Sequence, residues 1–335
     1  MPLATSKQML IKAQQGGYAV GAFNANNMEM VQAVIQAAEE EQAPVILQVS
    51  QGAIAYAGLE FASTLVKVAA ELSTVPVVLH LDHGTDFFQN VRCLRAGFTS
   101  LMYDGSAQPL EENIAVTRTI VDIAHSCDIP VEAELGKIPK IEDYEQMLGA
   151  GYDVRTKLPP PVQKAVADLM ARPEDVEHFV TTTGCDSLAA ALGSVHGMKS
   201  DVQPLSIARL QQIRQRTDVP LVLHGSSGVL RTRAEAEAKG IALQEGEGTV
   251  EDAIKNGVCK INVATELSMT FLRGMRAAWE QRPGEKDMRK IIKPGRDAVK
   301  EAVRSYIRQF GSTGKAADVL IQGKGIEGGE IKHHE

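Results

Sequence analysis

The chain has 335 residues, of which 44% are hydrophobic and 23% charged, a balance typical of a globular protein with a large buried core. A net charge of −7 argues against a nucleic-acid partner, and the apolar runs are too short to cross a bilayer, so we expect no membrane segment. The four cysteines, Cys93, Cys127, Cys185 and Cys259, have no paired spacing, which predicts a reducing, cytoplasmic location.

Short aliphatic runs alternate along the chain with helix-period stretches. The aliphatic runs predict strands near residues 18–23, 44–49, 76–81, 99–103, 130–134, 187–192, 220–223 and 259–263. The stretches between them predict helices that include 28–41, 59–72, 86–96, 110–126, 205–216 and 266–281. Eight strands, each followed by helical sequence, predict an α/β fold of the (β/α)8 TIM-barrel type in one domain spanning residues 1–322. A doubly wound sheet would show a Gly-rich turn after its first strand, where this chain has Asn24-Ala25-Asn26-Asn27.

Three stretches interrupt this rhythm. Residues 137–173 and 231–250 predict loop insertions after the fifth and seventh strands, on the face where barrel enzymes hold their active sites. Residues 323–335, rich in Gly, Lys, Glu and His, predict a disordered tail.

Polar residues follow most of the predicted strands, and a closed barrel brings these strand ends to one rim. Three of the eight histidines, His83, His196 and His224, stand at such ends, and each precedes a glycine. Neutral imidazoles are preferred zinc ligands, and three protein ligands leave the open position that a catalytic metal needs. The sequence therefore predicts a catalytic zinc site. His80 lies on the third strand itself, which predicts a buried neighbour of the site and not a ligand.

Two Gly- or hydroxyl-bearing segments follow the last two predicted strands. They are Gly225-Ser226-Ser227-Gly228 and Asn262-Val263-Ala264-Thr265. The loops after strands seven and eight form the usual phosphate site of barrel enzymes, so their position favours phosphate binding over an ordinary loop.

Seven motifs together resemble the class II, metal-dependent ketose-bisphosphate aldolases, from about residue 9 to about residue 314. They are Ala22-Phe23-Asn24, His80-Leu81-Asp82-His83-Gly84, Asp104-Gly105-Ser106, Val131-Glu132-Ala133-Glu134-Leu135-Gly136, Gly193-Ser194-Val195-His196-Gly197, His224-Gly225-Ser226-Ser227-Gly228 and Lys260-Ile261-Asn262-Val263-Ala264-Thr265. The resemblance implies a zinc-dependent lyase that reversibly cleaves a ketose 1,6-bisphosphate. Fructose 1,6-bisphosphate is the first candidate, and the products are dihydroxyacetone phosphate and glyceraldehyde 3-phosphate.

The resemblance also implies roles for individual residues. His83, His196 and His224 would hold Zn²⁺, with Asp104 and Glu134 as carboxylates at or beside a second metal position. Asp82 would move the proton at the C4 oxygen. Ser50 would lie near the far end of the substrate. A phosphate-binding set would lie beside a monovalent cation, Na⁺ or K⁺, and comprise Gly197, Gly225, Ser226, Ser227, Asn262, Ala264 and Thr265. The partner would be a small phosphorylated sugar, and we expect a homodimer or homotetramer.

Two departures from the family pattern leave points open. The base that exchanges the C3 proton is usually a glutamate on a Gly-rich loop, but this chain has Lys137-Ile138-Pro139-Lys140-Ile141 before the nearest match, Glu142. Proline stiffens such a loop, so Asp143 and Glu145 are alternatives. Ala264 stands where many fructose enzymes have Asp and resembles the tagatose type, so the sugar stays undecided. Lys293 and Arg296 lie in the region where family members often bind the second phosphate. Either residue could equally be an ordinary charge on a helix surface.

Three rival functions can be distinguished from this one. A Schiff-base aldolase could use Lys260, whose parity on the eighth strand points it into the barrel. A zinc hydrolase would use the same metal with a bound water but would need no phosphate loops. A relative that binds without catalysing would have lost part of the machinery.

Overall fold

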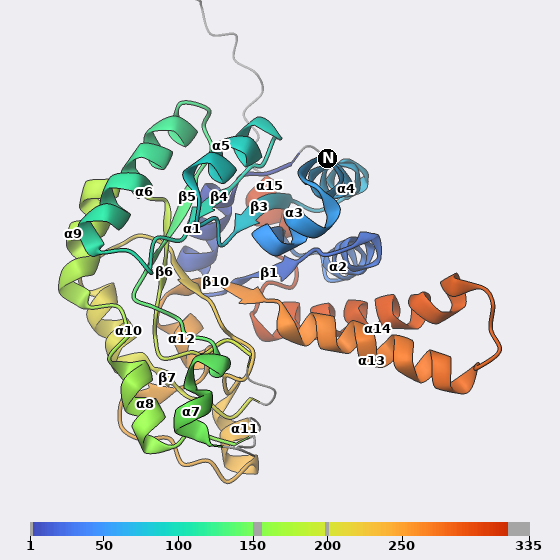
Figure 1. Cartoon of the computed structure of the whole chain (residues 1–335). Coiled ribbons are helices and arrows are strands. Elements are labelled where there is room, and N and C mark those ends of the chain that lie inside the picture. The colour runs from blue at the N-terminus through green and yellow to red at the C-terminus, as the bar shows by residue number, and fades with distance from the viewer. Residues whose placement is uncertain (1–2, 150–155, 198–200, 321–335) are drawn as a thin grey trace, which may run out of the picture.

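Alternation along each aliphatic run directs one set of side chains into a barrel and the other set toward surrounding helices. The computed structural model describes residues 3–149, 156–197 and 201–320. Its main sheet has eight parallel strands: β1 Val20–Asn24, β2 Val45–Ser50, β3 Val77–Asp82, β4 Leu101–Tyr103, β5 Val131–Leu135, β6 Ser187–Ala190, β8 Leu221–Leu223 and β10 Val258–Val263. All eight overlap the predicted runs, and the predicted TIM barrel is confirmed (Figure 1).

The sheet closes on itself. Its strand order is β3-β2-β1-β10-β8-β6-β5-β4, and the two end strands meet through the Leu81 N–H, which donates to Ser100 O at 3.0 Å. Bridges from His80 to Ser100 and from Gly84 to Tyr103 continue the seam. Because every strand runs the same way, all eight carboxyl ends lie at one rim.

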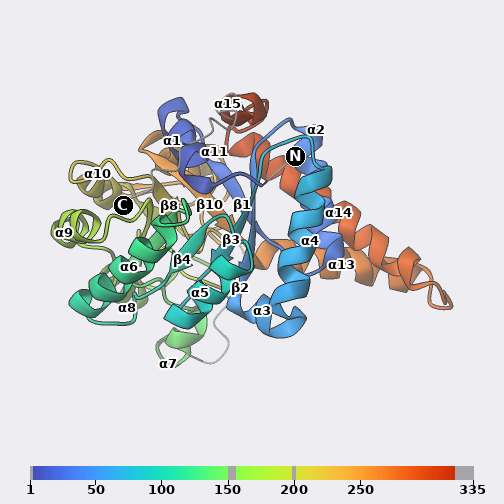
Figure 2. The same ribbon diagram turned by 90° about the horizontal axis from the view of Figure 1, so that it is seen from above.

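Helices cover the outside of the barrel (Figures 1 and 2). They are α2 Met28–Glu40, α3 Gln51–Ala57, α4 Leu59–Leu72, α5 Phe87–Arg95, α6 Leu110–His125, α9 Pro173–Thr183, α10 Ile207–Arg214, α12 Val250–Lys255, α13 Thr265–Gln281, α14 Met288–Gln309 and α15 Ala316–Leu320. The helix predicted over 205–216 begins later, because β7 Leu205–Ser206 pairs antiparallel with β9 Glu247–Gly248. Ser206 then caps α10, its Oγ accepting the Arg209 N–H.

Helix α1 (Ser6–Gly16) packs on the barrel interior. Its apolar residues Met9 and Leu10 form one buried cluster with Val20, Ile46 and Val78 from three neighbouring strands. The interior changes character toward the opposite rim, where inward positions on the same strands carry polar side chains. The apolar cluster therefore supports the polar layer in which the site is built.

The two predicted insertions carry structure of their own. Residues 137–173 contain a 3-10 turn η1 (Ile141–Tyr144) and helices α7 (Glu145–Leu148) and α8 (Pro160–Ala167). Ile141, Tyr144 and Val162 form a separate buried cluster with Val195 from the loop after β6. Residues 231–250 contain α11 (Arg233–Ala238) and β9. The tail expected over 323–335 lies outside the described residues.

Helices α13 and α14 pack against each other and project from the barrel as an arm (Figures 1 and 2). Gly274 and Gly295 allow this close approach, because a Cβ on Gly274 would lie 2.8 Å from the Gly295 Cα. Across the described part of the chain, no single helix has the length and apolarity of a membrane span. The bent pair α3 and α4 meets those criteria only jointly, across a 103° bend.

Candidate active site

The carboxyl ends of the barrel strands surround a cavity of about 580 Å³. The residues expected to act in catalysis, to hold the metal or to bind the first phosphate all line this cavity: Ser50, Asp82, His83, Asp104, Glu134, Glu142, His196, Gly197, His224, Gly225, Ser226, Ser227, Asn262, Ala264 and Thr265. Asn24, Gln48, Lys137, Ile138 and Lys140 also line it, without having been predicted for the site.

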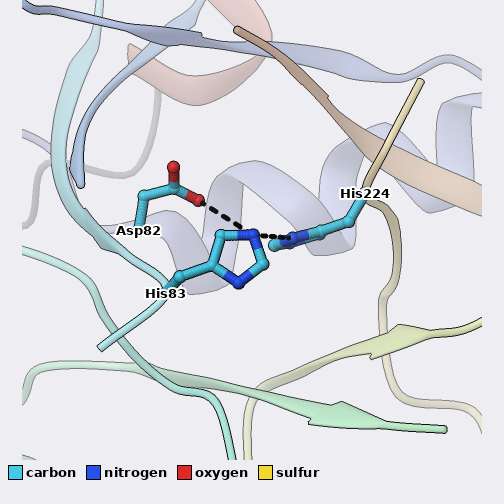
Figure 3. A group of neighbouring side chains, drawn as sticks. All are labelled: Asp82, His83 and His224. Carbon is cyan, nitrogen blue, oxygen red and sulfur yellow. Dashed lines mark hydrogen bonds and ion pairs between the residues drawn. The ribbon is translucent and has the colours of Figure 1, made fainter. Parts of the chain in front are cut away.

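His83 and His224 aim ring nitrogens at one point (Figure 3). The His83 Nε2 and the His224 Nδ1 are 3.0 Å apart. Their other nitrogens face carboxylates, His83 Nδ1 at 2.9 Å from Asp104 Oδ2 and His224 Nε2 at 2.9 Å from Glu132 Oε1. A carboxylate only accepts, so each ring donates its N–H outward and turns a lone pair inward.

Two lone pairs that face each other require a cation or proton between them, so this arrangement fits a metal. Two tetrahedral zinc ligands at about 2.0–2.1 Å from the ion lie roughly 3.3 Å apart, close to the separation found here. Burial opposes charge on His83, but the carboxylates of Asp82 and Asp104 outweigh it and raise the pKa of His83 to about 10. The surroundings therefore favour positive charge at this point.

His196 stands somewhat apart from the other two histidines. Its ring packs edge-on against His83 with centroids 5.6 Å apart. Among the described residues, potential ligand atoms gather within 4.8 Å in two groups, Asp82–His83–His224 and His83–Asp104–Glu134, and neither group includes His196. Burial, and then the charges of His83 and His224, lower the pKa of His196 to about 4, so the ring is neutral, as a ligand must be.

Asp82 ends β3 and is almost completely buried. Its two oxygens accept hydrogen bonds from Asn24 Nδ2 at 2.9 Å and Asn262 Nδ2 at 3.2 Å. Its Oδ1 lies 3.9 Å from His83 Nε2. Burial opposes ionisation, yet the charges of His83 and His224 and the Asn24 bond hold the pKa of Asp82 below its usual range. A fixed, ionised carboxylate thus lies beside the ring nitrogens of His83 and His224 that face each other.

Asp104 and Glu134 differ in what they contact. Asp104 holds His83 and accepts from the Ser106 Oγ at 2.6 Å. Glu134 Oε2 is buried without a hydrogen-bond partner and lies 3.7 Å from both His83 Nδ1 and His224 Nδ1. Burial, and then the charge of Asp104, raise the pKa of Glu134 to about 8. An unpartnered buried carboxylate oxygen suits a cation beside it.

A buried polar network beneath the site was not predicted from sequence. Lys260 Nζ donates to Glu132 Oε2 at 2.7 Å and to His80 Nε2 at 3.0 Å, and Glu132 in turn holds His224. Burial, and then the Lys260 charge, lower the pKa of His80 to about 3, so His80 is a neutral acceptor. The placement expected for His80 agrees with this geometry.

The same network argues against a Schiff-base mechanism. Lys260 is completely buried and does not line the cavity in the described part of the chain. Its amine is committed to Glu132 and His80, whereas a Schiff-base lysine must be unprotonated and reachable by the substrate.

Glu142 reaches the cavity despite Pro139. The His196 N–H donates to Pro139 O at 2.9 Å and the Ile141 N–H donates to His196 O at 2.9 Å, so the loop is fastened beside His196. A Cβ on Gly197 would lie 3.5 Å from both Glu142 carboxylate oxygens. Asp143 accepts from the Lys140 N–H at 2.9 Å, and neither Asp143 nor Glu145 is among the described residues that line the cavity.

The two predicted phosphate loops adjoin each other at the cavity. Ser226 Oγ donates to Asn262 O at 2.5 Å, so this hydroxyl ties the loops together and is not free for a ligand. Ser227 is less buried, and Thr265 is exposed at the first position of α13. Ser50 Oγ accepts the Ala53 N–H at 3.2 Å and caps α3. The arrangement offers backbone N–H groups and a helix N-terminus to an anion.

The basic residues expected for a second phosphate do not reach this cavity. Lys293 pairs with Asp297, and Arg296 NH1 donates to Gln32 Oε1 at 3.1 Å. Both lie on α14, part of the arm, and neither lines the cavity. Gln48, by contrast, donates to Asn24 Oδ1 at 2.7 Å and so supports the amide that holds Asp82. The sequence could have identified Gln48 as a site residue, because its position in the period-2 alternation of β2 directs its side chain into the barrel.

Comparison with known proteins agrees with this geometry. Residues 4–315 match the family described as fructose-bisphosphate aldolase class-II. The fructose-bisphosphate aldolase of Geobacillus stearothermophilus is 41% identical over 320 residues, which cover 95% of this chain and all of that protein. The Thermus caldophilus fructose-bisphosphate aldolase is 39% identical over 94% of this chain.

Solved structures show the same likeness. The crystal structure of the YdjI aldolase from Escherichia coli K12 superimposes with a TM-score of 0.72 at 32% identity, covering 94% of this chain and 99% of the other. A fructose-bisphosphate aldolase from Campylobacter jejuni, at 20% identity and a TM-score of 0.70, shares the fold. The resemblance seen in the motifs is confirmed, and the chain belongs to the class II fructose-bisphosphate aldolase family.

Proposed function

We propose that this protein is a zinc-dependent aldolase that reversibly cleaves fructose 1,6-bisphosphate into dihydroxyacetone phosphate and glyceraldehyde 3-phosphate. The observation that carries the proposal is the pair of ring nitrogens, His83 Nε2 and His224 Nδ1, which face each other 3.0 Å apart beside the Asp82 carboxylate and share one cavity with two phosphate-type loops. A zinc hydrolase would not need the two phosphate-type loops.

His83, His196 and His224 would hold the metal, with Asp104 and Glu134 as neighbouring carboxylates. When bound, zinc supplies Lewis-acid stabilisation of the negative charge that develops on the C2 oxygen. His196 would complete the set by a small movement of the loop after β6 toward His83, against which its ring already packs.

Asp82 would accept the proton of the C4 hydroxyl as the C3–C4 bond breaks, its electron pair passing toward C2 and the aldehyde leaving. Two amides, from the neighbouring strands β1 and β10, fix this carboxylate, so its oxygens are already placed. Glu142 would then deliver a proton to C3 of the remaining three-carbon fragment. In the condensation direction both transfers reverse.

Tagatose 1,6-bisphosphate is the alternative substrate, since Ala264 lines the cavity without a carboxylate. A Na⁺ or K⁺ ion would bind beside the phosphate near Thr265. Replacing Na⁺ and K⁺ in the buffer with a bulky organic cation should therefore lower activity. The four cysteines are unbridged, three of them buried, in keeping with the reducing cytoplasm.

One experiment separates the proposal from its rivals. Cleavage of fructose 1,6-bisphosphate is followed with and without a chelator, and borohydride is added to a parallel sample with substrate. We expect activity that the chelator abolishes and added zinc restores, with no covalent trapping. Chelator-resistant activity with trapping on Lys260 would contradict the proposal, as would a protein without aldol activity. Zinc content in His83→Ala, His196→Ala and His224→Ala tests each ligand, and full occupancy in all three would refute the set.

A further inference from the structure

The cavity is strongly acidic for a site that must accept phosphate. Three carboxylates line it, from Asp82, Asp104 and Glu142, together with the buried carboxyl group of Glu134. Among the described lining residues, the only lysine or arginine side chains are Lys137 and Lys140. Both come from the short segment 137–142 in which this chain departs from a Gly-rich pattern.

This segment is fixed against the phosphate loops. A Cβ on Gly225 would lie 3.2 Å from Ile138 Cγ2, and a Cβ on Gly197 would lie 3.0 Å from Ile141 Cγ2. Gly225 and Gly197 also have φ of +62° and +86°, which L side chains rarely adopt. The segment therefore covers the edge of the cavity where backbone N–H groups are offered to an anion. The two lysines belong to that edge.

Neither lysine forms an ion pair with a carboxylate among the residues that the structure describes. Within the described residues, no carboxylate lies within 4.0 Å of the Lys137 or Lys140 ammonium. Lys260, Lys293 and Lys300, in contrast, are all paired with Glu or Asp. Two ammonium groups that have no carboxylate partner among the described residues line this cavity and can offset its repulsion of a phosphate dianion.

We propose that Lys137 and Lys140 bind the substrate phosphate received by Gly197 and Gly225, the phosphate that stays on the dihydroxyacetone fragment. This inference rests on the proposed aldolase function and adds a residue pair to its substrate site. Backbone N–H groups supply direction but little net charge, whereas ammonium groups form charge-assisted hydrogen bonds to phosphate. Pro139 between them restricts the backbone, so both lysines stay at this edge.

The test compares Lys137→Met, Lys140→Met and the double variant with wild type, using a ketose 1,6-bisphosphate and the matching ketose 1-phosphate. Both substrates carry the retained phosphate, so KM should rise for both by the same factor. We expect about 10-fold for each single variant and more for the double variant, with kcat changed much less. Lys164→Met, on the exposed face of α8, is the matched control and should change neither constant.

Calorimetry with dihydroxyacetone phosphate on the zinc-loaded protein gives a readout that does not depend on turnover. Its Kd should weaken by the same factor as KM. An unchanged Kd in the double variant overturns the inference, and so does a KM increase confined to the bisphosphate, which would place the lysines at the other phosphate. A wild-type protein that cleaves neither substrate removes the proposed function. The calorimetric comparison then decides the inference on its own.

Discussion

Asp82 illustrates how much of the chemistry depends on single side chains at the rim. It lies beside the inward ring nitrogen of His83, and it also belongs to one of the two groups of potential ligand atoms among the described residues. If it transfers a proton and does not ligate, Asp82→Asn should retain zinc and lose about 10²–10⁴-fold in kcat. Elemental analysis and steady-state kinetics check both parts. Wild-type kcat would remove Asp82 from the mechanism, and loss of zinc would make it a ligand.

Glu142 gives a second prediction at this scale. As the C3 base, it is required for exchange of the dihydroxyacetone phosphate C3 proton with solvent, so Glu142→Gln should slow that exchange at least about 100-fold. NMR in deuterated buffer follows the exchange without needing the aldehyde. Glu145→Gln is the control, because Glu145 lies three residues further along the same loop without lining the cavity. Exchange at the wild-type rate in the Glu142 variant would show that Glu142 is not the C3 base but an ordinary surface charge.

Strands β5 and β10, which are separated in the sheet by β6 and β8, support the site through the Glu132–Lys260 pair. Lys260→Met leaves Glu132 buried without its counter-charge, which typically lowers the free energy of unfolding by about 3–5 kcal/mol. Because Glu132 orients His224, zinc affinity should also fall, by roughly 10–100-fold. Denaturant unfolding and chelator competition measure the two effects. Lys255→Met, on the exposed face of α12, is the control. Lost stability with unchanged zinc affinity would show that the network only supports the fold.

The elements also show which features the sequence could predict. Period-2 alternation correctly placed Asn262 and Lys260 inside the barrel, and all eight strands were found because each is a bounded aliphatic run. The contact between Lys260 and Glu132 could not be predicted. Their strands are not neighbours in the sheet, so the contact depends on the stagger of the closed barrel. Likewise, the sequence predicted that the Ser226 hydroxyl binds phosphate, but in the structure this hydroxyl donates its hydrogen bond to Asn262 O.

His196 and Glu142 mark a different limit of sequence reasoning. His196 lies six residues beyond the end of β6, where strand geometry no longer fixes direction. Its position depends on backbone pairing with Pro139 and Ile141, a contact between two irregular loops. Pro139 left the role of Glu142 open, and the same pairing brings Glu142 to the cavity. Long-range loop contacts of this kind leave no periodic signal in the sequence.

The whole molecule is predicted to be a homo-oligomer, and the arm formed by α13 and α14 is the surface we expect to mediate it. Leu272 and Trp279 on α13 are 57% and 54% exposed, large apolar groups on a projecting element (Figure 2). Light scattering after gel filtration should give two or four times the chain mass. Leu272→Asp with Trp279→Asp should shift it toward the monomer, whereas Leu72→Asp on α4 should not. A monomeric wild-type protein would contradict the prediction.

Helix α13 begins at Thr265 beside the phosphate loops and continues without a break for 17 residues into the arm, a length of about 25 Å. A continuous helix behaves as a stiff rod, so its two ends cannot be displaced independently. Near its midpoint, α13 packs closely against α14 where Gly274 meets Gly295. We therefore expect a neighbouring subunit bound at the arm to affect the helix end that lines the cavity, where we propose that the phosphate binds. If dilution dissociates the oligomer, we expect KM for the substrate to change before kcat does.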